Sequence, residues 1–126
     1  MDIYQQLADE ATVSLATQKR DGSQILTPLW LAGYNGKLYM RTIEGSAKVL
    51  RIANFPEVSL APCTWEGDIT GQWYNAVARL MSADEPLISA AENALQSKYG
   101  AERTKMTRMM KQQETALCYL ELSLTI

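Results

Sequence analysis

Residues 12–42 read TVSLATQKRDGSQILTPLWLAGYNGKLYMRT, a stretch with a hydrophobic period near two that is broken at two dipeptides. Asp21-Gly22 and Asn35-Gly36 are strong hairpin signals, because glycine and asparagine reach the positive φ angles of tight β-turns. The stretch therefore predicts antiparallel strands joined by short turns, at residues 12–18, 24–32 and 38–42.

Further strands are expected downstream of this stretch. Residues 58–63 alternate in polarity, and Pro62 favours a strand end or a bulge because proline cannot donate to a ladder. Residues 72–83 have no cleanly polar face, as expected for a strand that is buried on both sides. Residues 116–126 show the cleanest alternation in the chain.

Helical spacing occurs between and beside these strands. The first ten residues favour a short amphipathic helix, and residues 46–54 favour another, with Ser46 as its N-cap. Pro86 and Gly100 bracket a longer helix. The segment 102–113 is also helical, and we expect its methionines to pack in the core or at a dimer contact; they are Met106, Met109 and Met110.

The predicted elements define a fold class. Six strands, mostly joined by tight turns, with three or four helices outside them, indicate a mainly β, α+β protein. The expected architecture is a six-stranded antiparallel β-barrel, closed or split, with peripheral helices. We expect residues 1–126 to form one domain, since 126 residues with 47% hydrophobic content are enough for one core.

Composition excludes several function classes. A net charge of −2 gives no overall attraction to nucleic acid or to a membrane surface. The start of the chain lacks the pattern of a signal peptide, and its two cysteines fit a reducing compartment, so we expect a cytoplasmic protein with Cys63 and Cys118 as small core residues. The absence of histidine excludes Ser-His and Cys-His nucleophile pairs and histidine metal sites.

The segment around residue 46 is the best candidate for binding an anion. If Ser46 caps a helix, the first-turn amides are free and the positive end of the helix dipole faces outward. Lys48 and Arg51 share one helical face, Thr42 offers a hydroxyl, and Arg41 adds a further positive charge. These groups suit a phosphate. The alternative is an ordinary cap with two solvated basic side chains.

Several short segments between residues 8 and 83 carry more information together than any carries alone. They are Val13 to Thr17, Asp21-Gly22, Thr27-Pro28-Leu29-Trp30, Leu38 to Thr42, Ser46 to Arg51, Asn54 to Cys63 and Gly67 to Gly71. In this order and spacing they resemble the pyridoxamine 5′-phosphate oxidase-like family of FMN-binding split-barrel proteins. Within that family they are most similar to the deazaflavin (coenzyme F-420)-dependent oxidoreductases.

The resemblance implies a homodimer with cofactor sites at the subunit interface and a split barrel. It places the cofactor phosphate at Thr42, Ser46 and Lys48, with help from Arg51. It also places the backbone of one strand segment beside the isoalloxazine ring, namely that of Thr27, Pro28, Leu29 and Trp30. Arg41 would reach either the phosphate or the ribityl chain.

The chain departs from the pyridoxamine phosphate oxidases themselves. Those enzymes carry an Arg-x-x-x-x-Lys strand and a Ser-Arg-Lys cluster. The corresponding segments of this chain are TPLWLA at residues 27–32, without the arginine and the lysine, and Ser46-Ala47-Lys48. Their substrate-binding C-terminal segment also has no counterpart before Ile126. Oxidation of vitamin B6 is therefore not expected.

The function expected from the resemblance is hydride transfer between FMN or a deazaflavin and a small planar organic substrate, because the cofactor itself supplies this chemistry. One alternative is a non-catalytic protein that binds or carries a flavin, a deazaflavin or haem. Another is an interaction domain whose cofactor site has decayed. The aromatic residues fit either ring stacking or core packing; they are Trp30, Trp65, Trp73 and Tyr74.

Overall fold

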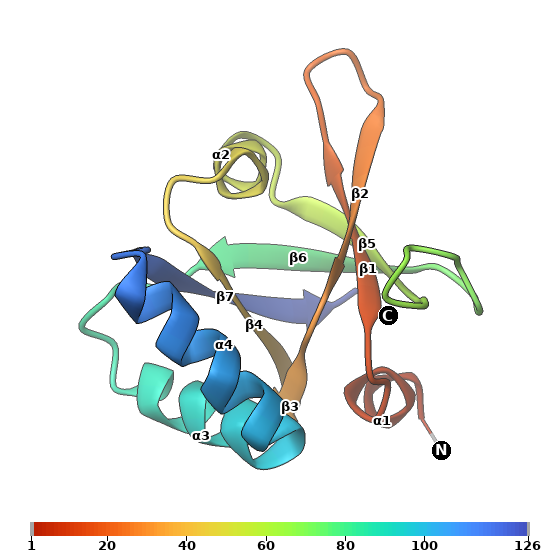
Figure 1. Ribbon diagram of the computed structural model, residues 1–126. Helices are drawn as coiled ribbons and strands as arrows, with labels where there is room; N and C mark the ends of the chain where they lie inside the picture. The colour runs from red at the N-terminus through yellow and green to blue at the C-terminus, as the bar shows by residue number, and fades with distance from the viewer. Residues whose placement is uncertain (1, 126) are drawn as a thin grey trace.

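A computed structural model describes residues 2–125, and within them seven antiparallel strands form one curled sheet with helices on its outside (Figure 1). The strands are β1 (Val13–Gln18), β2 (Gln24–Leu29), β3 (Ala32–Tyr34), β4 (Lys37–Ile43), β5 (Glu57–Pro62), β6 (Tyr74–Leu80) and β7 (Leu117–Leu124). The helices are α1 (Ile3–Ala8), α2 (Ala47–Asn54), α3 (Leu87–Tyr99) and α4 (Ala101–Gln112).

The expected fold class is confirmed, but one predicted strand is two. The run 24–32 breaks at Trp30 and Leu31, so β2 pairs with β1 and β3 pairs with β4. The strand order is β2-β1-β5-β6-β7-β4-β3, which puts β2 and β3 at opposite edges of the sheet. Because only two residues join these edges, the sheet has to curl into a barrel that stays split beside this corner.

Both predicted hairpin turns are confirmed. Tyr34 pairs with Lys37 across a two-residue loop, in which Asn35 has a φ of 50° and Gly36 a φ of 82°. These positive angles are those of a type I′ turn, whose twist matches the twist of the strands. The turns fix the register on each side of the Trp30-Leu31 corner, so alternate side chains enter the barrel.

The last turn of α3 holds this corner. The Lys98 ammonium donates to the carbonyl oxygens of Leu31 at 2.8 Å, Ala8 at 2.7 Å and Glu10 at 2.6 Å. The Tyr99 hydroxyl accepts from the Leu31 N–H at 3.0 Å and donates to the Ala11 carbonyl at 2.8 Å. Side chains of α3 thus replace the ladder bonds that the corner peptide cannot make. Burial lowers the pKa of Lys98 to about 8.

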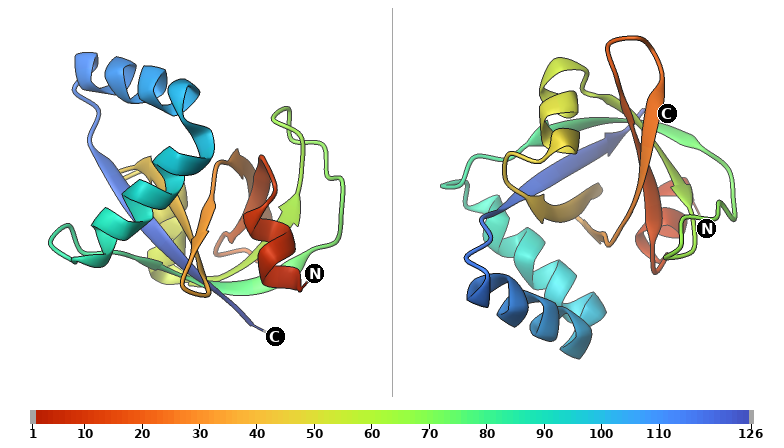
Figure 2. Two further views of the ribbon diagram at one scale, coloured as in Figure 1. Left: turned by 90° about the horizontal axis from the view of Figure 1, so that it is seen from below. Right: turned by 45° about the horizontal axis from the view of Figure 1, so that its top comes forward.

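The hydrophobic core fills the barrel, and α3 covers part of its outer surface. The fully buried side chains inside include those of Leu15, Met40 and Leu120. A smaller cluster lies outside β4, where Tyr39 packs with Met81 and with Ala91 of α3. Figure 2 shows α3 and α4 together on one side of the barrel, with α1 and α2 at separate places.

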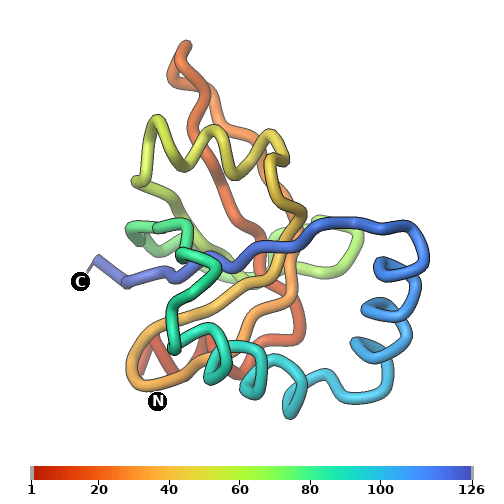
Figure 3. The backbone as a smooth tube through the Cα atoms, turned by 90° about the vertical axis from the view of Figure 1, so that its left-hand side faces the viewer, coloured from red at the N-terminus to blue at the C-terminus, as the bar shows by residue number. Residues whose placement is uncertain are grey.

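The helices α3 and α4 meet at a sharp bend and are joined by an ion pair whose arginine is buried. Figure 3 follows the chain from α3 through this bend into α4 and then into β7. Gly100 at the bend has a φ of 57° and a ψ of −126°, a conformation that disfavours residues with a Cβ. Beyond it, Arg103 of α4 is 1% exposed and donates two hydrogen bonds to Glu92 of α3. Arg103 therefore fixes α4 against α3.

Other expectations have mixed outcomes. Pro62 ends β5, as predicted, and Ser46 occupies the N-cap position of α2 but makes no capping hydrogen bond through its side chain. Cys63 is buried, whereas Cys118 is only half-buried, so the prediction of two core cysteines holds for the first alone. No helix within residues 2–125 has the length and apolar character needed to cross a membrane.

Replacing Lys98 with methionine should destabilise the protein. The change keeps most of the packing but leaves the carbonyls of Leu31, Ala8 and Glu10 without their shared donor. We expect the free energy of unfolding in urea to fall by about 2 to 3 kcal/mol, the usual cost of losing buried hydrogen bonds from a charged group. Lys111→Met, at an exposed position of α4, is the matched control. Equal stability of the two variants would contradict a corner held by Lys98.

Candidate functional site

A pocket opens where the barrel is split. The ladder between β3 and β4 ends at Tyr39, so within the described chain Met40 to Ile43 of β4 pair with β7 only. The free side of β4 faces the end of β2, and α4 contributes two methionines to the lining. We call this cavity of about 290 Å³ the split pocket; its lining includes Leu29, Trp30, Arg41, Thr42, Ile43, Lys48, Trp65, Leu95, Arg103, Met106 and Met110.

Hydroxyl groups and cations gather where β4 passes into α2. Lys48 Nζ donates to Thr42 Oγ1 at 2.9 Å, and Arg51 Nε donates to Thr17 Oγ1 at 2.7 Å. In the same segment, at the N-cap position of α2, the hydroxyl oxygen of Ser46 is buried and has no hydrogen-bond partner. We call Thr17, Thr42, Ser46, Lys48 and Arg51 the hydroxyl–cation cluster.

The two cations of the hydroxyl–cation cluster have no carboxylate partner among residues 2–125. Neither Lys48 nor Arg51 forms an ion pair with a carboxylate in the part of the chain that the structure describes. Burial, together with the positive charge of Arg51, lowers the pKa of Lys48. The N-terminus of α2 adds free amides and a positive dipole end to the same place. Together these groups can hold a phosphate-sized anion.

Arg41 also lines the split pocket but has a different partner from Thr42 and Lys48. Its side chain is 9% exposed and approaches Glu92 of α3, with Nη1 4.0 Å from Oε1. Glu92 also accepts a hydrogen bond from the Tyr119 hydroxyl of β7. The two hydrogen bonds from Arg103, with that from Tyr119, lower the pKa of Glu92 to about 2, so it is ionised at neutral pH.

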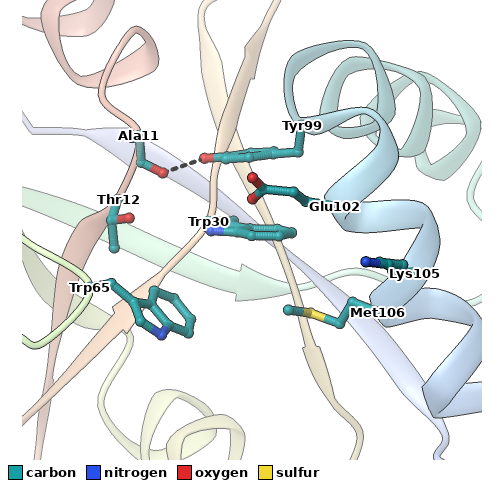
Figure 4. Close-up of a pocket in the computed structure, with 8 residues that line it drawn as sticks. All are labelled: Ala11, Thr12, Trp30, Trp65, Tyr99, Glu102, Lys105 and Met106. Atoms are coloured by element: carbon teal, nitrogen blue, oxygen red, sulfur yellow. Dashed lines mark hydrogen bonds between the residues drawn. The ribbon is translucent and has the colours of Figure 1, made fainter.

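Aromatic side chains form one wall of the split pocket and separate it from a second cavity. In Figure 4 the Trp30 ring lies parallel to that of Tyr99, with centroids 4.4 Å apart and an interplanar angle of 8°. Trp65 is tilted by 45° to Trp30 at 6.3 Å. We call this second cavity, of about 480 Å³, the aromatic pocket. Trp30, Trp65 and Met106 line both pockets, so Trp30 is a rigid partition between them.

The structure brings most of the predicted site residues to this region. Leu29, Trp30, Arg41, Thr42 and Lys48 line the split pocket, while Ser46 and Arg51 belong to the hydroxyl–cation cluster. Thr27 and Pro28 are half-buried in β2, opposite Leu15 and Ser14, and line neither pocket. Trp73 and Tyr74 also lie outside both.

Sequence reasoning missed the residues that α3 and α4 supply. Tyr99 and Arg103 have no motif around them, and only the folded bend at Gly100 brings them over the barrel. The helical spacing of the α4 methionines is visible in the sequence, but it predicts packing in the core or at a dimer contact and not a pocket lining. Met106 and Met110 line the split pocket, and Met109 is 58% exposed.

Comparison with known proteins identifies the fold. No protein-family model matches the chain, and no curated protein is similar to it in sequence. Among solved structures, HutZ, the heme storage protein from Vibrio cholerae, matches with a TM-score of 0.72 at 13% identity, over 100% of this chain and 92% of HutZ. An F420 reductase matches with a TM-score of 0.61 at 14% identity, over 100% of this chain and 96% of the reductase.

A third solved structure comes from Listeria innocua and is of a protein assigned to the pyridoxamine 5′-phosphate oxidases. It matches with a TM-score of 0.63 at 12% identity, over 95% of this chain and 88% of its own. At these identities the comparison concerns the fold alone. It confirms the fold that the sequence resemblance implies: this chain has the split-barrel fold that these solved structures share.

Proposed function

We propose that the protein is a homodimeric oxidoreductase that uses FMN or a deazaflavin of the coenzyme F-420 type. The observation that carries this proposal is the unpartnered, buried hydroxyl of Ser46 next to the Lys48–Thr42 hydrogen bond. A buried polar atom without a partner is rare in a folded protein and points to a missing ligand. The split-barrel fold supports a flavin-type ligand, since an F420 reductase shares it.

The hydroxyl–cation cluster would bind the phosphate of the cofactor. Ser46 and Thr42 supply hydroxyl groups, Lys48 supplies a charge that no carboxylate in residues 2–125 neutralises, and α2 supplies first-turn amides. Arg51 adds a second positive charge, although its Nε is already bonded to Thr17. A phosphate would satisfy the Ser46 hydroxyl and offset the cost of burying the Lys48 ammonium.

The flat part of the cofactor would lie along β2. The strand β2 is at an edge of the sheet and pairs only with β1 in the described chain, so one side of its backbone is free to bond a ring edge. When bound, a flavin or deazaflavin supplies the hydride chemistry. The protein's own residues bind it, orient it and exclude water, and none of them needs to transfer a proton.

The exposed apolar residues beside the hydroxyl–cation cluster support a dimer with its cofactor sites at the interface. Ile43 at the end of β4 is 46% exposed, and Leu50 on α2 is 59% exposed. Burying such side chains against a second copy would be favourable.

Cys63 and Cys118 are both free thiols, which supports a cytoplasmic location.

Lys48→Ala should weaken the binding of FMN by roughly 1.5 to 3 kcal/mol, because it removes a charge-assisted bond to phosphate. Binding of riboflavin, which lacks the phosphate, should hardly change. Flavin fluorescence titration measures both affinities. Lys19→Ala, in the exposed turn between β1 and β2, is the control. If Lys48→Ala weakened FMN and riboflavin equally, the phosphate site would lie elsewhere.

The dimer has its own test. Light scattering should give the wild type a mass of twice 14.1 kDa, and Leu50→Glu should shift it toward 14.1 kDa because the charge would be buried at the contact. The same variant should bind FMN more weakly if both chains line the site. Tyr34→Ser, at the exposed tip of the β3–β4 hairpin, should leave the mass unchanged. A wild-type mass of one chain at micromolar concentration would rule out the dimer.

Haem binding is a second candidate, favoured by the match to HutZ. With no histidine in the chain, the axial ligand would have to come from a side chain such as Met106 or Met110 in the split pocket. The absorption spectrum of freshly purified protein separates the candidates. We expect the bands of a bound flavin or the single band of a deazaflavin, whereas a sharp Soret band would favour haem.

A further inference from the structure

Arg41 has a buried positive charge that no carboxylate within residues 2–125 meets at hydrogen-bond distance. Its side chain is 9% exposed, and the nearest carboxylate oxygen, Oε1 of Glu92, lies 4.0 Å from Nη1, beyond hydrogen-bond distance. Proteins rarely leave a desolvated charge without a hydrogen-bonded counterion, because the desolvation penalty is several kcal/mol. The position of Arg41 therefore calls for an anion.

Glu92, the carboxylate nearest to Arg41, is shared with other donors. Oε2 accepts from Nη1 of Arg103, and Oε1 accepts from Nη2 of Arg103 and from the Tyr119 hydroxyl. Two guanidinium groups thus share one carboxylate, which leaves one positive charge in excess. Burial, with the repulsion from Arg103, lowers the pKa of Arg41.

The excess charge faces a cavity with apolar walls. Arg41 and Arg103 line the split pocket, whose other walls include Leu29, Trp30 and Met106. A few polar groups at one end of a mostly apolar cavity are the usual pattern of a site for a small organic ligand. A cavity of about 290 Å³ is large enough for a substituted ring.

A phosphate at the hydroxyl–cation cluster would leave this charge in place. Arg41 and Thr42 are consecutive in β4, and consecutive side chains leave opposite faces of a strand. Thr42 bonds Lys48 of α2, whereas Arg41 approaches Glu92 of α3. Arg41 and Thr42 therefore present their polar groups to different partners.

We propose that Arg41 binds the carboxylate of a small aromatic acid, whose ring lies against Trp30 and Met106 in the split pocket. This names the substrate class of the proposed oxidoreductase and rests on that proposal. One spare charge matches a monoanion, and a guanidinium binds a carboxylate through two parallel hydrogen bonds. The stacked Trp30–Tyr99 pair supplies a rigid flat surface for the ring.

The test compares benzoate with benzamide, which has the same shape but no charge. Titrated into the protein without cofactor and followed by calorimetry, benzoate should bind at least about tenfold more tightly than benzamide, as one charge-assisted pair predicts. Arg41→Gln should bring the two affinities to within about twofold, since that pair is then lost. Arg20→Gln, in the exposed turn after β1, is the control and should keep the preference. Equal affinities in the wild type would overturn the proposal.

Two more variants and ligands distinguish a carboxylate site from a cofactor contact. Arg41→Lys keeps the charge but not the paired geometry, so it should keep a reduced preference for benzoate even if Arg41→Gln does not fold. FMN should bind Arg41→Gln as it binds the wild type; a loss of FMN affinity with the benzoate preference intact would show that Arg41 serves the cofactor, and would overturn the proposal. If the wild type bound no FMN but still preferred benzoate, the oxidoreductase would fail while the carboxylate site stood.

Discussion

The hydrogen bonds from Lys98 and Tyr99 of α3 to the Leu31 peptide are the interaction on which the rest of the structure depends. The chain runs from one edge of the sheet to the other through Trp30 and Leu31, and within residues 2–125 no strand pairs with the Leu31 N–H and carbonyl. Lys98 and Tyr99 supply the missing partners and so hold the corner closed on one side. On the other side β4 keeps a free edge, and the split pocket lies beside it. The same contact therefore closes the barrel at the corner and leaves it open beside β4.

The same contact gives the pocket its rigid wall. The Tyr99 hydroxyl is bonded to the main chain at Leu31 and Ala11, so its ring is fixed, and Trp30 stacks on that ring. A tryptophan at a strand end would otherwise be free to rotate. Here its rotamer is set by the helix that holds the neighbouring peptide. Preorganisation of this kind lowers the entropic cost of binding a flat ligand.

Much of the fold was predictable because short-range signals set it. Asp21-Gly22 and Asn35-Gly36 fixed two hairpins, and Pro62 marked a strand end. The break at Trp30-Leu31 was not predictable, because both residues are apolar and suit a continuous strand. Only the bonds from Lys98 and Tyr99, more than sixty residues away, make that break favourable. The seventh strand is thus a product of tertiary contacts.

In the candidate site, too, one part was predictable from the sequence and another was not. The hydroxyl–cation cluster is formed largely within one strand–helix segment, so the spacing of Thr42, Ser46 and Lys48 was enough to suggest it. The role of Arg41 depends instead on Arg103, which reaches Glu92 across the bend at Gly100. Because Arg103 hydrogen-bonds the one carboxylate near Arg41 in the described chain, a residue on α4 decides how far the charge of a residue on β4 is neutralised. A charge of this kind cannot be recognised from its own neighbours in the sequence, and in this fold α3 and α4 are therefore the elements that set the chemistry of the pocket.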